Sequence, residues 1–179
     1  MTSILEVEQL DTLSSNASST LTIGGTNTTT IAFGPNVTTT PSSLKNTPAF
    51  RARLSSNQSV SGATWTVLSL ATEDFDIGGY YDNSTYRWTP PSGGKFYIHF
   101  QVRNNTGQDY MYCSIFKNGT TEVAMAQATI SSAGILSSGA IITPNGTDYY
   151  NLQVNPGTGS TIAAGEGFTF FEAFKLIGA

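Results

Sequence analysis

Charge is scarce in this chain. Only 11% of its 179 residues are charged, against roughly 25% in an average soluble domain. The eight Lys and Arg residues are scattered and the formal net charge is -4, so no basic stripe is available for a nucleic-acid backbone. The surface must be built mostly from Ser, Thr, Asn and Gly, and we predict no nucleic-acid partner.

Cysteine and histidine occur once each, as Cys113 and His99. A single cysteine forms no intramolecular disulfide, and its place in a strand pattern predicts a small buried apolar residue. The single histidine is predicted on the outward face of a strand and no Gly-x-Ser-x-Gly elbow accompanies it, which argues against nucleophilic catalysis and against a His/Cys metal site. We therefore predict a protein that is not an enzyme and holds no cofactor.

No apolar run is long enough to cross a bilayer, so we predict no membrane span. Residues 1–6 also lack the basic start and the apolar stretch of a secretory signal. These features favour a protein that is made in a host cytoplasm and carried outside on an assembled particle. Asn-x-Ser/Thr triplets are frequent, but abundant Ser and Thr make them common by chance.

The sequence does contain many short strand patterns separated by turn residues. The clearest is residues 95–103, where apolar and polar side chains alternate with the two-residue period of a half-buried strand. Asn118-Gly119 is the favoured type I′ hairpin pair. Similar segments predict an all-β sandwich over residues 49–179, with strands at 49–54, 64–70, 86–89, 110–116, 121–127, 138–142, 150–154 and 168–177. The last strand is apolar on both faces, with Phe171 on one and Phe170 and Phe174 on the other, which predicts a central position.

Residues 1–48 differ from the rest in being rich in Thr, Ser and Asn, with Phe33 as their one aromatic residue. A possible capping box is followed by apolar residues at every third position, which fits a short docking helix or an extended segment: Ile4, Val7, Leu10 and Leu13. Residues 21–24 and 31–34 repeat one short alternating pattern, which predicts a Thr-rich β shaft that intertwines with other copies. Residues 38–48 are typical of a linker.

Several motifs occur in a recognisable order: Gly78-Gly79-Tyr80-Tyr81-Asp82, Trp88-Thr89-Pro90, Gly94-Lys95-Phe96-Tyr97 with Phe100, Lys117-Asn118-Gly119, and the terminal aromatic strand. Together they resemble the C1q-like globular head of the C1q and tumour-necrosis-factor superfamily, of the kind found in bacteriophage fibre or decoration proteins. The resemblance covers roughly residues 49–179. It implies a homotrimeric jelly-roll β-sandwich that acts as a binding or structural module.

The resemblance also suggests particular sites. Some C1q-like proteins bind calcium near their trimer axis, and the carboxylates of Asp74, Asp76 and Asp82 are candidate ligands, with a solvated acidic loop as the other interpretation. Aromatic residues that the strand patterns place outward would lie in a trimer interface, unless they pack inside the sandwich. The strand at 110–116 is expected to pair with the strand at 95–103, so that their outward rings share one face. These interface candidates are Tyr97, His99, Tyr110, Tyr112 and Phe171.

Three segments are predicted as distal loops with possible receptor or glycan contacts: 74–83, 104–109 and 133–137. Trp65, Tyr80 and Tyr81 are candidate stacking residues, with packing inside turns as the alternative. We predict a non-enzymatic protein of the virion surface, a trimeric short-fibre or capsid-decoration protein whose N-terminal segment binds other virion proteins and whose head binds the host surface. The alternative is a soluble lectin-like or cytokine-like extracellular ligand with a receptor-binding head.

Overall fold

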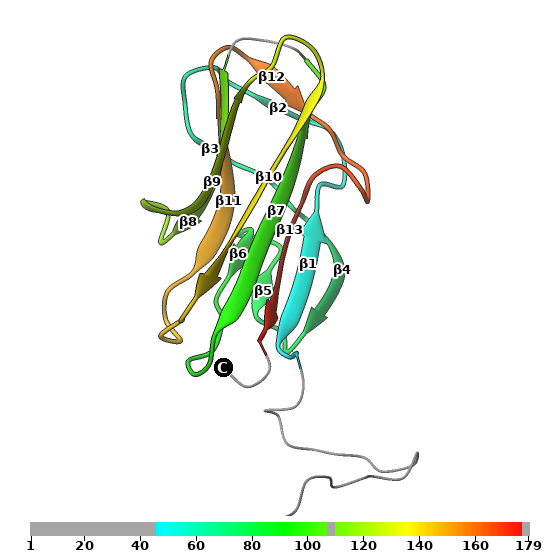
Figure 1. The fold of residues 1–179 in the computed structure, drawn as a ribbon. Helices are drawn as coiled ribbons and strands as arrows, with labels where there is room; N and C mark the ends of the chain where they lie inside the picture. Colours follow the sequence, from blue (N-terminus) through cyan, green and yellow to red (C-terminus); the bar gives the residue numbers. More distant parts are fainter. Residues whose placement is uncertain (1–45, 107–109, 177–179) are drawn as a thin grey trace, which may run out of the picture. The chain divides into compact units, whose positions relative to one another are not determined.

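The computed structural model describes residues 46–106 and 110–176, which form two antiparallel β-sheets packed face to face (Figure 1). The described residues contain no helix, and none of them therefore forms a helical membrane span. The strands are β1 (Ala49–Arg53), β2 (Gln58–Val60), β3 (Thr66–Val67), β4 (Thr72–Ile77), β5 (Tyr81–Asp82), β6 (Arg87–Trp88), β7 (Phe96–Asn104), β8 (Tyr110–Lys117), β9 (Thr121–Thr129), β10 (Gly134–Ile142), β11 (Tyr150–Pro156), β12 (Ser160–Ile162) and β13 (Phe170–Lys175).

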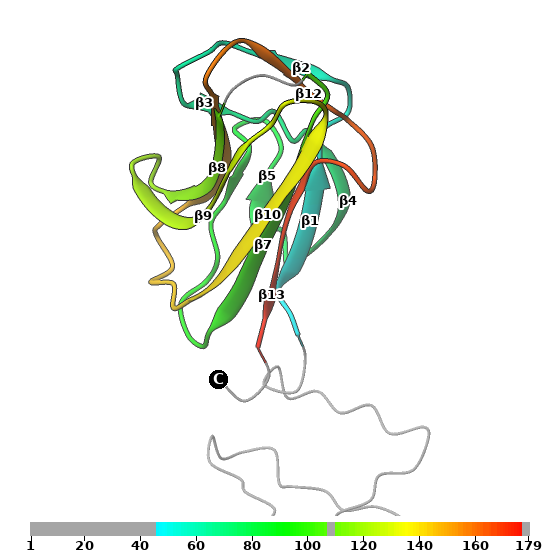
Figure 2. The same ribbon diagram turned by 45° about the horizontal axis from the view of Figure 1, so that its top comes forward.

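The first sheet, sheet A, has the strand order β2-β12-β7-β13-β1-β4, and β10 pairs with β7 along its whole length. The second sheet, sheet B, has the order β5-β6-β11-β8-β9, with β3 also paired to β11. The last strand, β13, lies between β7 and β1, as Figures 1 and 2 show. The predictions of an all-β jelly-roll sandwich and of a central terminal strand are confirmed.

The core lies between the sheets, where each long strand directs alternate residues. Along β7, the side chains of Phe96, Ile98, Phe100 and Val102 are completely buried. Trp88 lies at the centre of an aromatic cluster, with its ring centroid 5.0 Å from that of Phe50 and 5.5 Å from that of Phe96. Large rings that pack at these distances supply much of the apolar area that stabilises such a sandwich.

Phe171 belongs to this core, so its predicted place in a trimer interface is wrong. Its side chain is fully buried, and its ring meets that of Phe50 edge to face at 4.9 Å. The alternation along β13 explains the difference, because Phe171 and Ala173 point between the sheets while Phe170 and Phe174 lie on the other face of the strand.

Several predicted boundaries also change. The strand predicted at 64–70 is only the two-residue β3, and part of the loop predicted at 74–83 is β4, an outer strand paired with β1. The loop predicted at 133–137 is mostly the first half of β10. The turn at Asn118-Gly119 is confirmed, because both residues have the positive φ angles, 53° and 73°, that a type I′ turn requires.

Two buried groups behave as ordinary core residues. The hydroxyl of Tyr81 donates a hydrogen bond of 2.8 Å to the backbone oxygen of Leu70, and burial raises its pKa well above the usual range. Burial likewise raises the pKa of the Cys113 thiol. Tyr81 is therefore a packed residue at this position, with 7% of its surface exposed, and not an exposed stacking residue.

Candidate subunit interface

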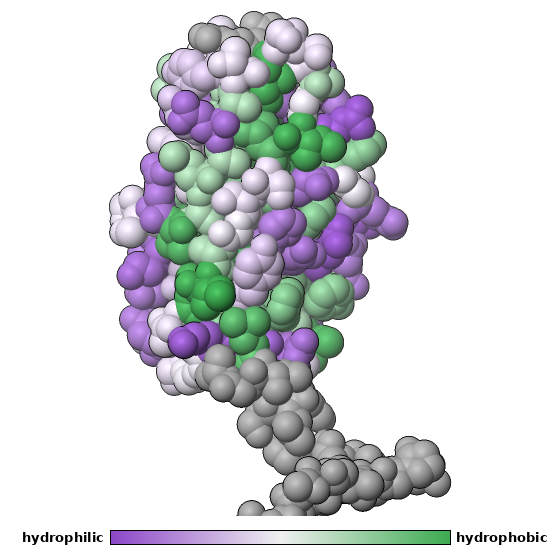
Figure 3. Space-filling view, viewed as in Figure 1, coloured by the Kyte–Doolittle hydropathy of each residue, from purple (hydrophilic) through white to green (hydrophobic). Residues whose placement is uncertain are grey.

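Among the described residues, the large apolar side chains with the highest exposed fractions lie on the outward face of sheet A. On β10, Ile135 and Ile141 are 56% and 62% exposed, and Phe168 and Phe174 are 38% and 36% exposed. Figure 3 shows hydrophobic surface at both ends of this face, with a hydrophilic band between them. Monomeric proteins seldom leave apolar side chains grouped in this way in water.

The register of the strands explains the hydrophobic surface at one end of this face. At one end, the pairing of five neighbouring strands places five residues in one row across the sheet: Ile141, Tyr97, Phe174, Ala49 and Ile77. The ring of Tyr97 lies 5.6 Å from that of Phe174, so the centre of the row is continuous. We call these five residues the apolar row.

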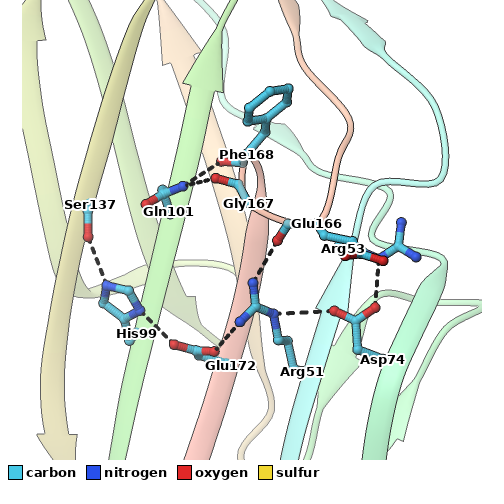
Figure 4. A network of polar contacts seen from close by, with 10 residues as sticks. All are labelled: Arg51, Arg53, Asp74, His99, Gln101, Ser137, Glu166, Gly167, Phe168 and Glu172. Carbon is cyan, nitrogen blue, oxygen red and sulfur yellow. Dashed lines mark hydrogen bonds and ion pairs between the residues drawn. The ribbon is translucent and has the colours of Figure 1, made fainter.

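The adjacent register positions hold a network of polar contacts, drawn in Figure 4. His99 Nδ1 lies 3.0 Å from Glu172 Oε1, and Arg51 donates from Nη1 to Glu172 Oε2 at 3.3 Å. Asp74 lies 3.3 Å from Arg51 Nε and accepts a 2.6 Å hydrogen bond from Arg53 Nε. We call these five residues, together with Ser137 on β10, which contacts His99, the polar network.

The arginines and carboxylates of the polar network balance in charge, because two arginines face two carboxylates. Arg51 also donates from Nη2 to the backbone oxygen of Glu166 at 2.7 Å, and its guanidinium carbon lies 3.9 Å above the ring of Phe170. Charged groups that already satisfy one another lose less on burial than isolated charges do. This face therefore suits burial against another protein surface.

Three of these side chains are arranged in the order of a catalytic triad, a feature that sequence analysis missed. His99 Nε2 lies 2.8 Å from Ser137 Oγ, while His99 Nδ1 contacts Glu172. Such a triad also needs donors for an oxyanion and a cleft for the substrate. Ser137 instead lies on an open sheet face and lines neither of two surface cavities of about 370 and 440 Å³. Glu172 is also shared with Arg51. We assign the three residues to the polar network.

The four remaining predicted interface residues lie on two different sheets. Tyr97 and His99 lie on the outward face of sheet A, next to the exposed apolar residues. Tyr110 and Tyr112 lie on β8 in sheet B, whose neighbours are β11 and β9. The predicted pairing of this strand with residues 96–102 is wrong, and the two tyrosines belong to a different face. The participation of Tyr97 and His99 in a trimer stays a prediction.

Ile135 and Ile141 were not among the interface candidates predicted from the sequence. Ile135 fell in a predicted loop, and the strand was predicted to begin only at residue 138. The usable signal was the alternation along residues 134–142, in which Ile135, Ser137, Gly139 and Ile141 are exposed while Leu136 and Ile142 are buried.

The candidate calcium ligands are each engaged elsewhere. Asp74 pairs with Arg51 and Arg53, while Asp76 Oδ2 accepts a hydrogen bond from the backbone N–H of Tyr81. Asp82 accepts hydrogen bonds from Ser84 and Thr85, mainly from the Ser84 hydroxyl, and these lower its pKa to about 2. Within residues 46–106 and 110–176, no group of three or more His, Cys, Asp or Glu side chains lies close enough to hold a metal ion.

The remaining predicted residues fall into two groups. Trp65 is half-buried on the outer side of sheet B, and Tyr80 is 37% exposed. The docking residues Ile4, Val7, Leu10 and Leu13, together with the shaft repeats at 21–24 and 31–34, lie outside the described residues. The domain boundary at residue 48 stays a prediction.

Comparison with known proteins gave structural likeness without sequence likeness. No family model and no curated protein sequence matches the chain. Among solved structures, the globular domain of zebrafish complement 1qA aligns with a TM-score of 0.55 at 15% identity, covering 72% of this chain and 97% of that one. Murine APRIL aligns with a TM-score of 0.60 at 11% identity, covering 72% and 98%.

A third structure, Eiger TNF from S. frugiperda, aligns with a TM-score of 0.56 at 12% identity, covering 73% of this chain and 93% of that one. These three proteins share the two-sheet arrangement while differing from this chain at most positions. Their likeness confirms the fold that the motifs suggested. The described part of the chain is a jelly roll of the C1q/TNF type.

Proposed function

We propose that this chain is a non-enzymatic structural protein of the virion surface, a homotrimeric short-fibre or capsid-decoration protein. In this proposal residues 1–48 dock on other virion proteins, and the head of residues 49–179 projects from the particle and contacts the host surface. The C1q/TNF-like fold supports a binding or structural head. The low charge content and the Thr-rich repeats at 21–24 and 31–34 support a short shaft on a particle.

The exposed apolar face of sheet A supports the proposal of a trimer. The apolar row runs across five strands, and Ile135 and Phe168 extend the apolar surface at the other end of the face. Three copies arranged around a threefold axis would cover this face and form a closed assembly. Because the fold is that of a family whose heads are trimeric, three copies are favoured over two.

The oligomeric state is tested by the mass of the full chain in solution. Three copies of the 19.0 kDa chain would give about 57 kDa by sedimentation velocity at micromolar concentration. A species of 19.0 kDa at the same concentration would refute the trimer.

Particle docking is tested by deleting residues 1–45 in the genome that encodes the protein. The deletion stops there because Pro48 accepts a hydrogen bond from the N–H of Lys175 and so belongs to the head. We expect a folded trimeric head that is absent from purified particles. Incorporation at the wild-type level would contradict the docking role. Complete absence of the full-length protein from particles would instead favour the extracellular ligand.

A further inference from the structure

Aromatic side chains also gather on the outward face of sheet B, away from the proposed subunit interface. Along β8, Met111, Cys113 and Ile115 point into the core, so Tyr110, Tyr112 and Phe116 point outward. Trp65, just before β3, lies on the same side, with its ring 4.8 Å from that of Phe116 and 6.5 Å from that of Tyr112. The rings of Tyr112 and Tyr110 are 5.0 Å apart.

Neutral polar side chains flank these rings. In the strand register, Tyr112 lies between Asn155 on β11 and Gln127 on β9, and Tyr110 lies opposite Thr129. Gln127 and Thr129 are exposed, while Trp65, Tyr110 and Tyr112 are half-buried. Amide groups both donate and accept hydrogen bonds, and tyrosine and tryptophan offer an apolar face beside a polar atom.

The charge of this face selects the class of ligand. In β8, β9 and β11 the only charged residues are Lys117 and Glu122. Both lie at the hairpin end, where Lys117 follows Phe116 and Glu122 is paired opposite it. A surface without cations gives no attraction to phosphate, sulfate or carboxylate groups. A neutral sugar ring matches it, because its C–H face stacks on an aromatic ring while its hydroxyls exchange hydrogen bonds with amides.

We propose that Trp65, Tyr110, Tyr112, Gln127 and Asn155 form a binding site for an uncharged oligosaccharide. Rigid aromatic side chains give contact area at a low cost in conformational entropy, and a few polar groups fix the orientation of the ligand. The site deepens the proposed contact with the host surface by naming the ligand class. All five residues belong to one subunit, so the sugar site can be tested independently of the trimer.

Fluorescence of the full-length protein gives a selective readout. Trp88 is completely buried whereas Trp65 is half-buried, so a ligand-dependent change in tryptophan emission reports Trp65. The probes are maltohexaose, cellohexaose, chitohexaose and mannohexaose, with heparin hexasaccharide as the acidic comparison. Each is titrated to about 10 mM, which detects dissociation constants in the millimolar range.

We expect at least one neutral hexasaccharide to bind and heparin not to bind. Tyr112→Ala and the exposed Gln127→Ala should each weaken binding by about tenfold or more, with unchanged mass and melting temperature. The matched control is Tyr80→Ala, which removes an exposed tyrosine elsewhere and should leave binding unchanged.

Three outcomes would overturn the site. One is that no neutral probe binds, and another is that only heparin binds. The third is binding that both Tyr112→Ala and Gln127→Ala leave intact. A monomeric protein that still binds sugar through these residues would refute the trimer while supporting the site.

Discussion

Replacing Ile141 by serine tests the subunit interface most directly. This side chain is 62% exposed in one subunit, and fully burying an isoleucine contributes about 2.5 kcal/mol. Covering its exposed part would contribute about 1.5 kcal/mol for each copy, or about 4 to 5 kcal/mol for a trimer. The substitution should therefore raise the trimer dissociation constant roughly a thousandfold, while the fold of each subunit is maintained because Ile141 is not part of the core.

Met125→Ser is the matched control. Met125 is 48% exposed, lies on β9 at the edge of sheet B and faces away from the apolar row. Sedimentation velocity over a range of protein concentrations should show dissociation of Ile141→Ser at concentrations where Met125→Ser and wild type remain trimeric. Equal dissociation of the two variants, or none for Ile141→Ser, would refute the assignment of the interface to sheet A.

Three further predictions concern the head itself. Phe171→Ala should destabilise the fold by about 3 to 5 kcal/mol and lower the melting temperature measured by calorimetry by roughly 10 °C. A variant that is monomeric but as stable as wild type would instead indicate that Phe171 belongs to the subunit interface. The Asp82 pKa is lowered from 3.8 to about 2 mainly by the Ser84 hydroxyl, so its contribution to stability is present above about pH 4 and is lost as pH falls towards 2. The difference in melting temperature between wild type and Asp82→Asn should shrink over that interval, and a constant difference would argue against it. The buried Cys113 thiol should react with a disulfide reagent only as fast as the protein unfolds, whereas rapid labelling of the native protein would contradict its burial.

The fold was predictable because most long strands carry their own burial pattern. Residues 95–103 alternate cleanly, Asn118-Gly119 sets a hairpin, and the doubly apolar terminal strand requires a central position. The short strands β2 and β12 were missed because three residues carry too little periodicity. The strand β4 was missed because its acidic residues resemble those of a loop, although pairing with β1 holds it extended.

The candidate interface was only partly predictable. The sequence shows which residues of a strand share a face, but the neighbours of that strand depend on topology. Tyr97 and His99 were assigned to the outward face of their strand, but residues 110–116 were paired with the wrong neighbour. The polar network combines residues from β1, β4, β7, β10 and β13. Contacts between elements so distant in sequence leave no local signal.

The acidic residues of β4 have a consequence beyond their ion pairs. This strand is at the edge of sheet A and carries three acidic residues, Glu73, Asp74 and Asp76. It also carries Phe75 and Ile77, which are 44% and 52% exposed. An exposed edge strand with such apolar side chains would pair with strands of other chains and so promote fibrillar aggregation. Carboxylates at this position repel the same strand of another copy. This repulsion would keep a newly made chain from aggregating before it assembles with the other subunits of the proposed trimer.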